Sequence, residues 1–211
     1  MYEFGRTLHE FMIKEPHPLA VVHDAVLEFL EPRDDAVIFG AYAVNAYVSE
    51  PRMTQDVDIM TVHASELAEE IRAYLAKKFY IAVRTRKIAD GIGFRVYQVQ
   101  SDGNRHLVDV RKVEKLPPSK RVKGWLTLAP EELIASKVSA YARRNRKPKG
   151  GTDLRDLSIL LLTFPEFKTK SGPVSDALKR MEDKDISEVL RVWDRIVANE
   201  IDSTDDEEYG Y

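Results

Sequence analysis

The sequence predicts an α+β fold in which a mixed β-sheet is followed by a C-terminal helical domain. Residues 36–60 have the pattern of a strand, a helix and a second strand. Three segments between residues 79 and 110 are rich in β-branched and aromatic residues, with Asp-Gly pairs where hairpin turns are expected. Beyond them apolar residues recur at helical spacing. The predicted domains are 1–125 and 126–200, followed by a disordered acidic tail at 201–211.

Composition indicates a soluble globular chain. It has 211 residues, 44% of them apolar, and no apolar run near the ~20 residues that cross a bilayer. The absence of cysteine excludes disulfides, thiolate catalysis and cysteine zinc sites. No basic leader precedes an apolar stretch, so a cytoplasmic location without a membrane partner is expected. The net charge is −3, but the tail holds five acids and no base, so the rest of the chain carries +2.

The first elements are two amphipathic helices, expected within residues 1–14 and 19–31. His17-Pro18 separates them and Pro32 ends the second. The histidines in this region lack the spacing of a metal site, so we assign no chemistry to it.

The central stretch begins with a short apolar strand that ends at Gly40. Ala43, Val44 and Tyr47 then recur at helical spacing, which makes Gly40 and Ala41 a helix entrance. The unpaired N–H groups and the positive dipole end of a helix N-terminus attract anions, and glycine lets them approach the backbone closely. We therefore expect a triphosphate to bind here.

Asp56 and Asp58 end this stretch on a predicted strand. Side chains two residues apart on a strand point to the same face, so both carboxylates converge. Adjacent like charges are unfavourable without a cation between them, and hard oxygen ligands suit Mg²⁺. The pair therefore predicts a metal site.

A third acid, Asp109, follows in the next predicted elements. Ser65 is expected to cap a helix through about residue 78, and strands are expected at 79–85, 92–100 and 105–110. In the last strand, alternation places Leu107 and Asp109 on one face. A buried carboxylate is unfavourable without a partner. If this strand lies beside that of Asp58, three carboxylates form a two-metal site.

The next segment, 111–124, has the composition of a basic connector, and a short strand is expected at 126–128. A helix then begins at Pro130 and runs to about residue 146, with Lys137 among its apolar positions. The helix ends in a basic cluster, followed by a terminating Pro148 and Gly150-Gly151. Its members are Arg143, Arg144, Arg146, Lys147 and Lys149. This cluster is either a solvated helix end or an RNA contact.

Three further helices complete the predicted helical domain. Thr152 is expected to cap the first, whose opening turn places Asp153 and Asp156 on one face. The other two, at 173–181 and 185–199, show ordinary bundle packing.

These motifs resemble the nucleotidyltransferase superfamily, whose fold is polymerase-β-like, and in particular AbiEii-like toxins of type IV toxin-antitoxin pairs. The resemblance rests on Gly40-Ala41-Tyr42-Ala43, Arg52-x-Thr54-x-Asp56-x-Asp58, the later Asp109, Lys137-Val138-Ser139-Ala140 and Asp153-Leu-x-Asp156-Leu. It covers residues 36–162. Ala41 departs from the Gly or Ser usual in the family, which removes a hydroxyl contact to phosphate but keeps the N–H.

The resemblance implies an enzyme that moves a nucleoside monophosphate from an NTP to an acceptor hydroxyl and releases pyrophosphate. The implied metal ligands, for two Mg²⁺ ions with Mn²⁺ as an alternative, are Asp56, Asp58 and Asp109. The implied nucleotide site comprises Gly40, Ala41, Arg52, Thr54, Lys137 and Asp156. Asp153 is implied as a base or as a group that orients Lys137. The family implies tRNA 3′ ends as acceptor, which suits Arg143, Arg144 and Arg146 as RNA contacts, and a cognate antitoxin as partner.

Two other functions stay open from the sequence. One is a nucleotide-binding or partner-binding module that has lost catalysis, of which Ala41 would be the first sign and against which the intact carboxylates argue. The other is a transferase that acts on a protein or on a small molecule such as an aminoglycoside, because the motifs do not encode the acceptor.

Overall fold

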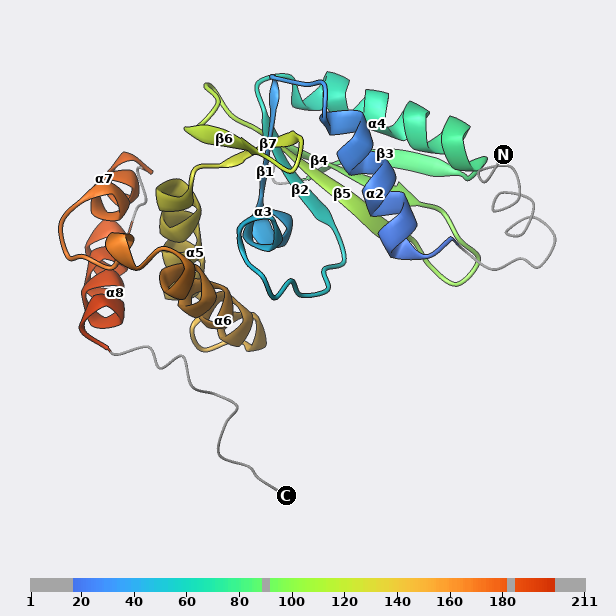
Figure 1. Cartoon of the computed structure of the whole chain (residues 1–211). Coiled ribbons are helices and arrows are strands. Elements are labelled where there is room, and N and C mark those ends of the chain that lie inside the picture. The colour runs from blue at the N-terminus through green and yellow to red at the C-terminus, as the bar shows by residue number, and fades with distance from the viewer. Residues whose placement is uncertain (1–16, 89–91, 182–184, 200–211) are drawn as a thin grey trace. The chain divides into compact units, whose positions relative to one another are not determined.

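The computed structural model describes residues 17–88, 92–181 and 185–199 (Figure 1). The helix expected within 1–14, the Asp90-Gly91 turn and the acidic tail at 201–211 lie outside the described residues. The chain divides into two compact units. One extends to Ala46 and resumes from Arg52 to Leu128, and the other holds Tyr47–Pro51 and the chain from Ala129 on.

The first unit contains a seven-stranded mixed sheet. Its strands are β1 (Ala36–Phe39), β2 (Val57–Thr61), β3 (Val83–Ile88), β4 (Gly93–Gln98), β5 (Arg105–Lys112), β6 (Ser119–Val122) and β7 (Trp125–Leu128), in the order β3-β4-β5-β2-β1-β7-β6. The β2–β5 and β1–β7 pairs are parallel and the others antiparallel. The predicted α+β class with a mixed sheet is confirmed.

The sheet of this unit has one apolar face, on which helices pack, and one polar face. The helices of the unit are α2 (Leu19–Leu30), α3 (Gly40–Tyr47) and α4 (Ala64–Phe79), of which α4 packs on β3, β4 and β5, and α2 packs against α4 (Figure 1). Val57 and Ile59 of β2 are fully buried, whereas Asp58 and Met60, which point the other way, are partly exposed. The carboxylates thus belong to the polar face.

The predicted connector at 111–124 contains a strand that the sequence analysis missed. β6 pairs with β7, and the turn between them places Lys123 and Gly124 in the left-handed region, with φ of 53° and 103°. Such a two-residue turn matches the twist of a hairpin. β6 is an edge strand, and charged side chains are common on such strands. Its exposed Lys120 and Arg121 therefore interrupt the alternation of apolar residues by which a strand is recognised in the sequence. The strand expected at 126–128 is confirmed as part of β7.

The second unit is helical. Its elements are α5 (Pro130–Arg144), α6 (Pro148–Thr163), the short 3₁₀ helix η2 (Pro165–Phe167), α7 (Pro173–Arg180) and α8 (Ile186–Ala198). Leu133, Leu157 and Trp193 are fully buried in this unit, which accounts for the apolar spacing in the sequence. Among the described residues, no helix combines the length and apolar character needed to cross a membrane.

Two predicted helix caps are wrong. Helix α6 begins at Pro148, so Thr152 lies inside it, and α4 begins at Ala64, so Ser65 does too. Proline is favourable at the first helical position because its fixed φ suits the helix. Gly150 does not terminate α5; a Cβ at this residue would lie 2.4 Å from the carbonyl oxygen of Arg144. It therefore permits α6 to start close to the end of α5.

Candidate functional site

Two of the predicted carboxylates lie side by side on neighbouring strands. In the parallel β2–β5 pair, Asp58 is the register partner of Asp109. Asp56 lies two residues earlier, just before β2 begins. The adjacency of the two strands, on which the prediction of a three-carboxylate site depended, is therefore present.

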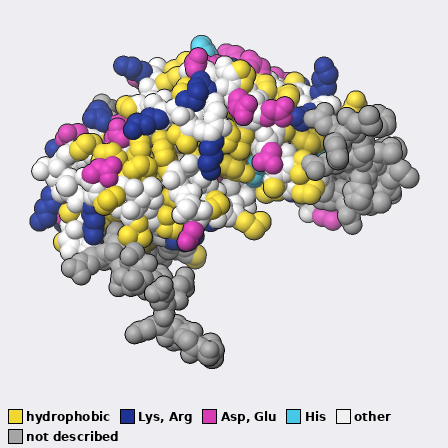
Figure 2. Space-filling view, viewed as in Figure 1, with side chains coloured by type: hydrophobic (Ala, Val, Ile, Leu, Met, Phe, Trp, Pro, Cys, Tyr) yellow, Lys and Arg dark blue, Asp and Glu magenta, His cyan; other side chains and the backbone are white. Residues whose placement is uncertain are grey.

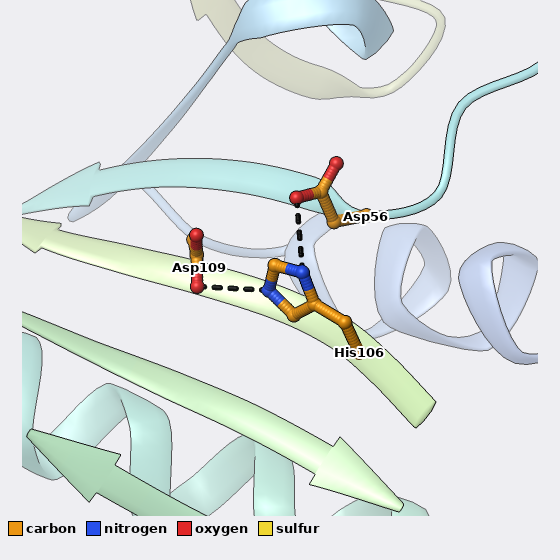
Figure 3. A group of neighbouring side chains, drawn as sticks. All are labelled: Asp56, His106 and Asp109. Atoms are coloured by element: carbon orange, nitrogen blue, oxygen red, sulfur yellow. Dashed lines mark hydrogen bonds and ion pairs between the residues drawn. The ribbon is translucent and has the colours of Figure 1, made fainter. Parts of the chain in front are cut away.

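His106 connects two of these acids, as Figure 3 shows. Its Nδ1 is 3.2 Å from Asp56 Oδ2, and its Nε2 is 2.8 Å from Asp109 Oδ1. One ligand atom each from Asp56, His106 and Asp109 lie within 4.8 Å of one another. Asp58 is not part of that group, and the imidazole of His106 links Asp56 to Asp109.

A β-bulge brings His106 to this position. The β4–β5 register shifts between Val96 and Tyr97, so that Tyr97 pairs with His106. Leu107, which regular alternation would place on the face of Asp109, is fully buried. Bulges commonly re-aim side chains beside functional sites. Regular alternation along the strand does not predict His106 at this position, and its only sequence signal is its spacing of three from Asp109.

Arg95 is a second missed partner of Asp109. It lies opposite Asp109 across the β4–β5 pair and donates through Nε and Nη2 at 2.9 and 2.8 Å. Burial would raise the pKa of the Asp109 carboxyl, but the hydrogen bonds from Arg95 and His106 hold that pKa well below its ordinary value. Asp109 is therefore a stable carboxylate even without a metal ion.

Gly40 is packed against Asp58. Its φ is 70°, in the left-handed region, and a Cβ there would lie 2.0 Å from Asp58 Oδ2. Only glycine allows both the backbone conformation and this contact. Gly40 and Ala41 open α3 as predicted. Gly40 thus sets the place of a carboxylate as well as the start of the helix.

Asn45 on α3 fixes the loop that carries Arg52 and Thr54. Its side chain donates to the Arg52 carbonyl at 2.8 Å and accepts from the Arg52 N–H at 3.0 Å. The Thr54 hydroxyl donates to the Asp56 carbonyl at 3.3 Å. Both contacts hold the backbone leading into Asp56, which gives Thr54 and Asn45 a positioning role.

Helix α3 is itself anchored to α2. The Tyr42 hydroxyl and His23 Nδ1 form a hydrogen bond of 2.7 Å. Burial, and then the positive charge of Arg105, lower the pKa of His23 to about 4, so His23 is neutral at pH 7. The helix entrance is thereby held against the rest of the first unit.

The predicted site residues of the second unit form a buried ionic cluster. Lys137 Nζ is 2.6 Å from Asp156 Oδ2 and 3.9 Å from Asp153 Oδ1. Arg144 Nη2 lies 2.8 Å from Asp153 Oδ2. Burial raises the pKa of the Asp153 carboxyl, against the opposing effect of Arg144 and Lys137. Two cations and two acids balance each other, as burial of charge requires.

The three arginines predicted to contact RNA have different surroundings. Arg144 belongs to the ionic cluster, Arg143 donates to Ser139 Oγ at 2.8 Å, and Arg146 is exposed. Among the described residues Arg146 makes no ion pair or hydrogen bond. The basic end of α5 is therefore not uniformly available to a ligand.

The acids of the first unit fit a divalent cation. The ligand atoms of Asp56, His106 and Asp109 lie within 4.8 Å of one another, and carboxylate oxygens are the ligands that Mg²⁺ prefers. Asp58, beside Asp109, offers further carboxylate oxygens.

Comparison with known proteins identifies similar chains. A family profile described as "Nucleotidyl transferase AbiEii toxin, Type IV TA system" matches residues 25–208. The Megavirus polyadenylate synthase superposes with a TM-score of 0.57 at 12% identity, over 70% of this chain and 32% of that one. JHP933 from Helicobacter pylori superposes with a TM-score of 0.54 at 12% identity, over 87% of this chain and 91% of that one.

These matches differ in what they establish. The present chain spans about a third of the length of the Megavirus enzyme. At such identities the superpositions show a shared fold, and they confirm the predicted nucleotidyltransferase fold. No curated protein sequence matches the chain significantly.

Proposed function

Since the chain belongs to the AbiEii family of nucleotidyltransferases from type IV toxin-antitoxin systems, we propose that this enzyme transfers a nucleoside monophosphate from an NTP to the 3′ hydroxyl of an RNA, with tRNA as the acceptor. The observation that carries the proposal is that Asp58 and Asp109 are register partners on neighbouring strands beside the glycine that opens α3, while Asp56, just before β2, is joined to Asp109 through His106. Such carboxylates are the protein's part of a metal-assisted phosphoryl-transfer site.

The transfer breaks one bond and forms another. The acceptor oxygen attacks the α-phosphorus, the bond from that phosphorus to the pyrophosphate oxygen breaks, and the hydroxyl proton is released. Asp56, Asp58 and Asp109 would hold two Mg²⁺ or Mn²⁺ ions, which when bound neutralise phosphate charge and lower the pKa of the attacking hydroxyl. Arg95 and His106 hold Asp109 as a carboxylate, and His106 also contacts Asp56.

The remaining predicted residues bind the nucleotide. The N–H groups of Gly40 and Ala41 would receive the β and γ phosphates at the start of α3, where the helix dipole is positive. Arg52, on the loop held by Asn45, adds positive charge, and Thr54 positions the backbone of Asp56. In this proposal the missing hydroxyl of Ala41 weakens phosphate binding without abolishing it.

We assign the ionic cluster of the second unit to the same reaction. Lys137 is a point-charge ligand for the triphosphate, Asp156 holds its ammonium, and Asp153 serves as base or orients Lys137. The family description supports a protein antitoxin as a partner of this toxin. Lys137 is already paired with the Asp156 carboxylate, which keeps its ammonium group in place before the nucleotide binds.

Labelled NTPs test the reaction. The protein is incubated with each α-labelled NTP, Mg²⁺ and total tRNA, and RNA is then separated from protein and small molecules. We expect label in tRNA with the wild type and none with Asp58→Asn, which should keep its fold because the substitution preserves side-chain shape. Lys87→Ala, an exposed change on the opposite face of the sheet, is the matched control and should retain transfer.

Three results would contradict the proposal. Label in protein or in a small molecule would identify another acceptor, and wild-type turnover by a folded Asp58→Asn variant would end the two-metal mechanism. NTP binding without transfer to any acceptor would favour a binding module that has lost catalysis.

A further inference from the structure

A row of charged side chains crosses four strands on the polar face of the sheet. Arg86 of β3 lies opposite Arg95 of β4, Arg95 lies opposite Asp109 of β5, and Asp109 is the register partner of Asp58 in β2. Directly opposed residues of neighbouring strands point to the same face. The row therefore leads from the carboxylates to the edge strand β3.

Two more arginines share this face. Arg84 lies two residues before Arg86 and opposite Tyr97, and Arg111 lies two residues after Asp109. The Arg111 guanidinium stacks over the Phe39 ring at 4.9 Å from its centroid. Positive charge thus lies both beside the carboxylates and beyond them.

Arg84 and Arg86 of β3 have no partner of opposite charge among the residues that the structure describes. Arg84 and Arg86 are exposed, and neither makes a hydrogen bond or ion pair with any residue that the structure describes. Arg86 lies directly opposite Arg95, whose own charge is paired with Asp109. An anion bound along β3 would therefore pair with Arg84 and Arg86.

This cluster is a local feature. The chain has a net charge of −3, and Figure 2 shows acidic and basic side chains interspersed on the face in view. On the polar face of the sheet, Arg84, Arg86 and Arg111 surround the row that ends at Asp109, so three cations lie close to the carboxylates.

We propose that Arg84, Arg86 and Arg111 bind the phosphate backbone of the polynucleotide acceptor next to its reacting hydroxyl. This inference rests on the proposed function. Strands are about 4.8 Å apart, so Arg86 lies about 10 Å from Asp109 along the sheet, a span that roughly three stacked nucleotides cover at 3.4 Å per phosphate. Tyr97, partly exposed opposite Arg84, offers a ring for base stacking.

A pair of charge-matched variants tests the assignment. Arg84→Ala/Arg86→Ala removes two charges from the polar face. Lys77→Ala/Lys87→Ala removes two exposed charges from the opposite side, because Lys87 opposes Phe94 in the row that leads to buried Val110 and Lys77 lies on α4. Binding of a fluorescent single-stranded RNA with a free 3′ hydroxyl is measured against salt concentration, and NTP binding is measured by calorimetry.

We expect the arginine variant to flatten the slope of log affinity against log salt by about 1.4, at roughly 0.7 per lost phosphate contact on a single strand. The control variant should keep the wild-type slope, and Arg84→Lys/Arg86→Lys should restore it. NTP affinity should be unchanged in all variants, because the triphosphate is assigned to other residues.

Each other outcome overturns the inference. Equal slopes in the two alanine variants would show that Arg84 and Arg86 do not bind RNA phosphates, and would favour an acidic protein surface as the partner of this face. A loss of NTP affinity in the arginine variant would assign these cations to the nucleotide. The same proteins are assayed for transfer. RNA labelling by the wild type with unchanged KM for RNA in the arginine variant would reject only this inference, whereas absence of RNA labelling by the wild type would reject the proposed function itself.

Discussion

Gly40 illustrates how much a single residue of this protein determines. The same position opens α3, adopts a left-handed backbone and makes room for the Asp58 carboxylate. A larger side chain at Gly40 therefore does not report on phosphate binding alone, because it also displaces a predicted metal ligand. His106 likewise has more than one role, since its imidazole contacts both Asp56 and Asp109.

We expect Gly40→Ala to abolish transfer and to lower the free energy of unfolding by about 1–3 kcal/mol, because alanine is strained in the left-handed region and its Cβ overlaps Asp58 Oδ2. Urea unfolding and single-turnover transfer measure the two effects. Gly103→Ala is the control: φ is 122° there, but no atom lies within 4 Å of the added Cβ. It should lose stability and keep transfer; retained activity in Gly40→Ala would contradict the contact.

At the scale of elements, helix ends and strand pairing decide which charges meet. The early start of α6 at Pro148 and the close approach at Gly150 bring Asp153 to Arg144 at the end of α5. Arg144 therefore has a structural task that Arg146, two residues later, does not have. The triple substitution of Arg143, Arg144 and Arg146 would combine loss of the cluster with any loss of RNA contact.

Arg144→Ala should lower the free energy of unfolding by roughly 1–3 kcal/mol, because it leaves the buried Asp153 carboxylate with Lys137 at 3.9 Å as its remaining cation. This loss is smaller than that of a fully buried pair, since Arg144 is partly exposed. Arg146→Ala should change stability by about 0.5 kcal/mol or less. Chemical denaturation compares the two, and equal losses would show that Asp153 does not depend on Arg144. Arg143→Ala/Arg146→Ala then measures RNA contact with the cluster intact.

At the scale of the whole molecule, a bound metal ion should stabilise the fold without being required for it. Asp109 already has Arg95 and His106 as partners, so the protein should fold without a metal ion. A bound ion still adds stability by mass action, because the unfolded chain lacks the assembled carboxylates.

Mg²⁺ or Mn²⁺ should raise the free energy of unfolding by roughly 2.7 kcal/mol at a concentration one hundred times its Kd. For a chain of this size that corresponds to a rise in melting temperature of roughly 2–4 °C per kcal/mol. Thermal unfolding across a metal titration measures the effect, and removal of the ion by a chelator should reverse it. Asp56→Asn should shrink the shift. An identical melting temperature at every metal concentration in the wild type would argue against a metal site among these acids.

The sequence by itself determined the strand, helix and strand around Gly40 and the helical character of the second unit. These follow from periods of 2 and 3.6 residues and from glycine and proline chemistry, which act over a few neighbouring residues. The tertiary structure alone decided that Asp109 meets Arg95, that a bulge turns His106 toward Asp56, and that Arg86 extends the row of charges to the sheet edge. Those contacts depend on which strands pair and in which register, and a shift of one residue would send each side chain to the other face.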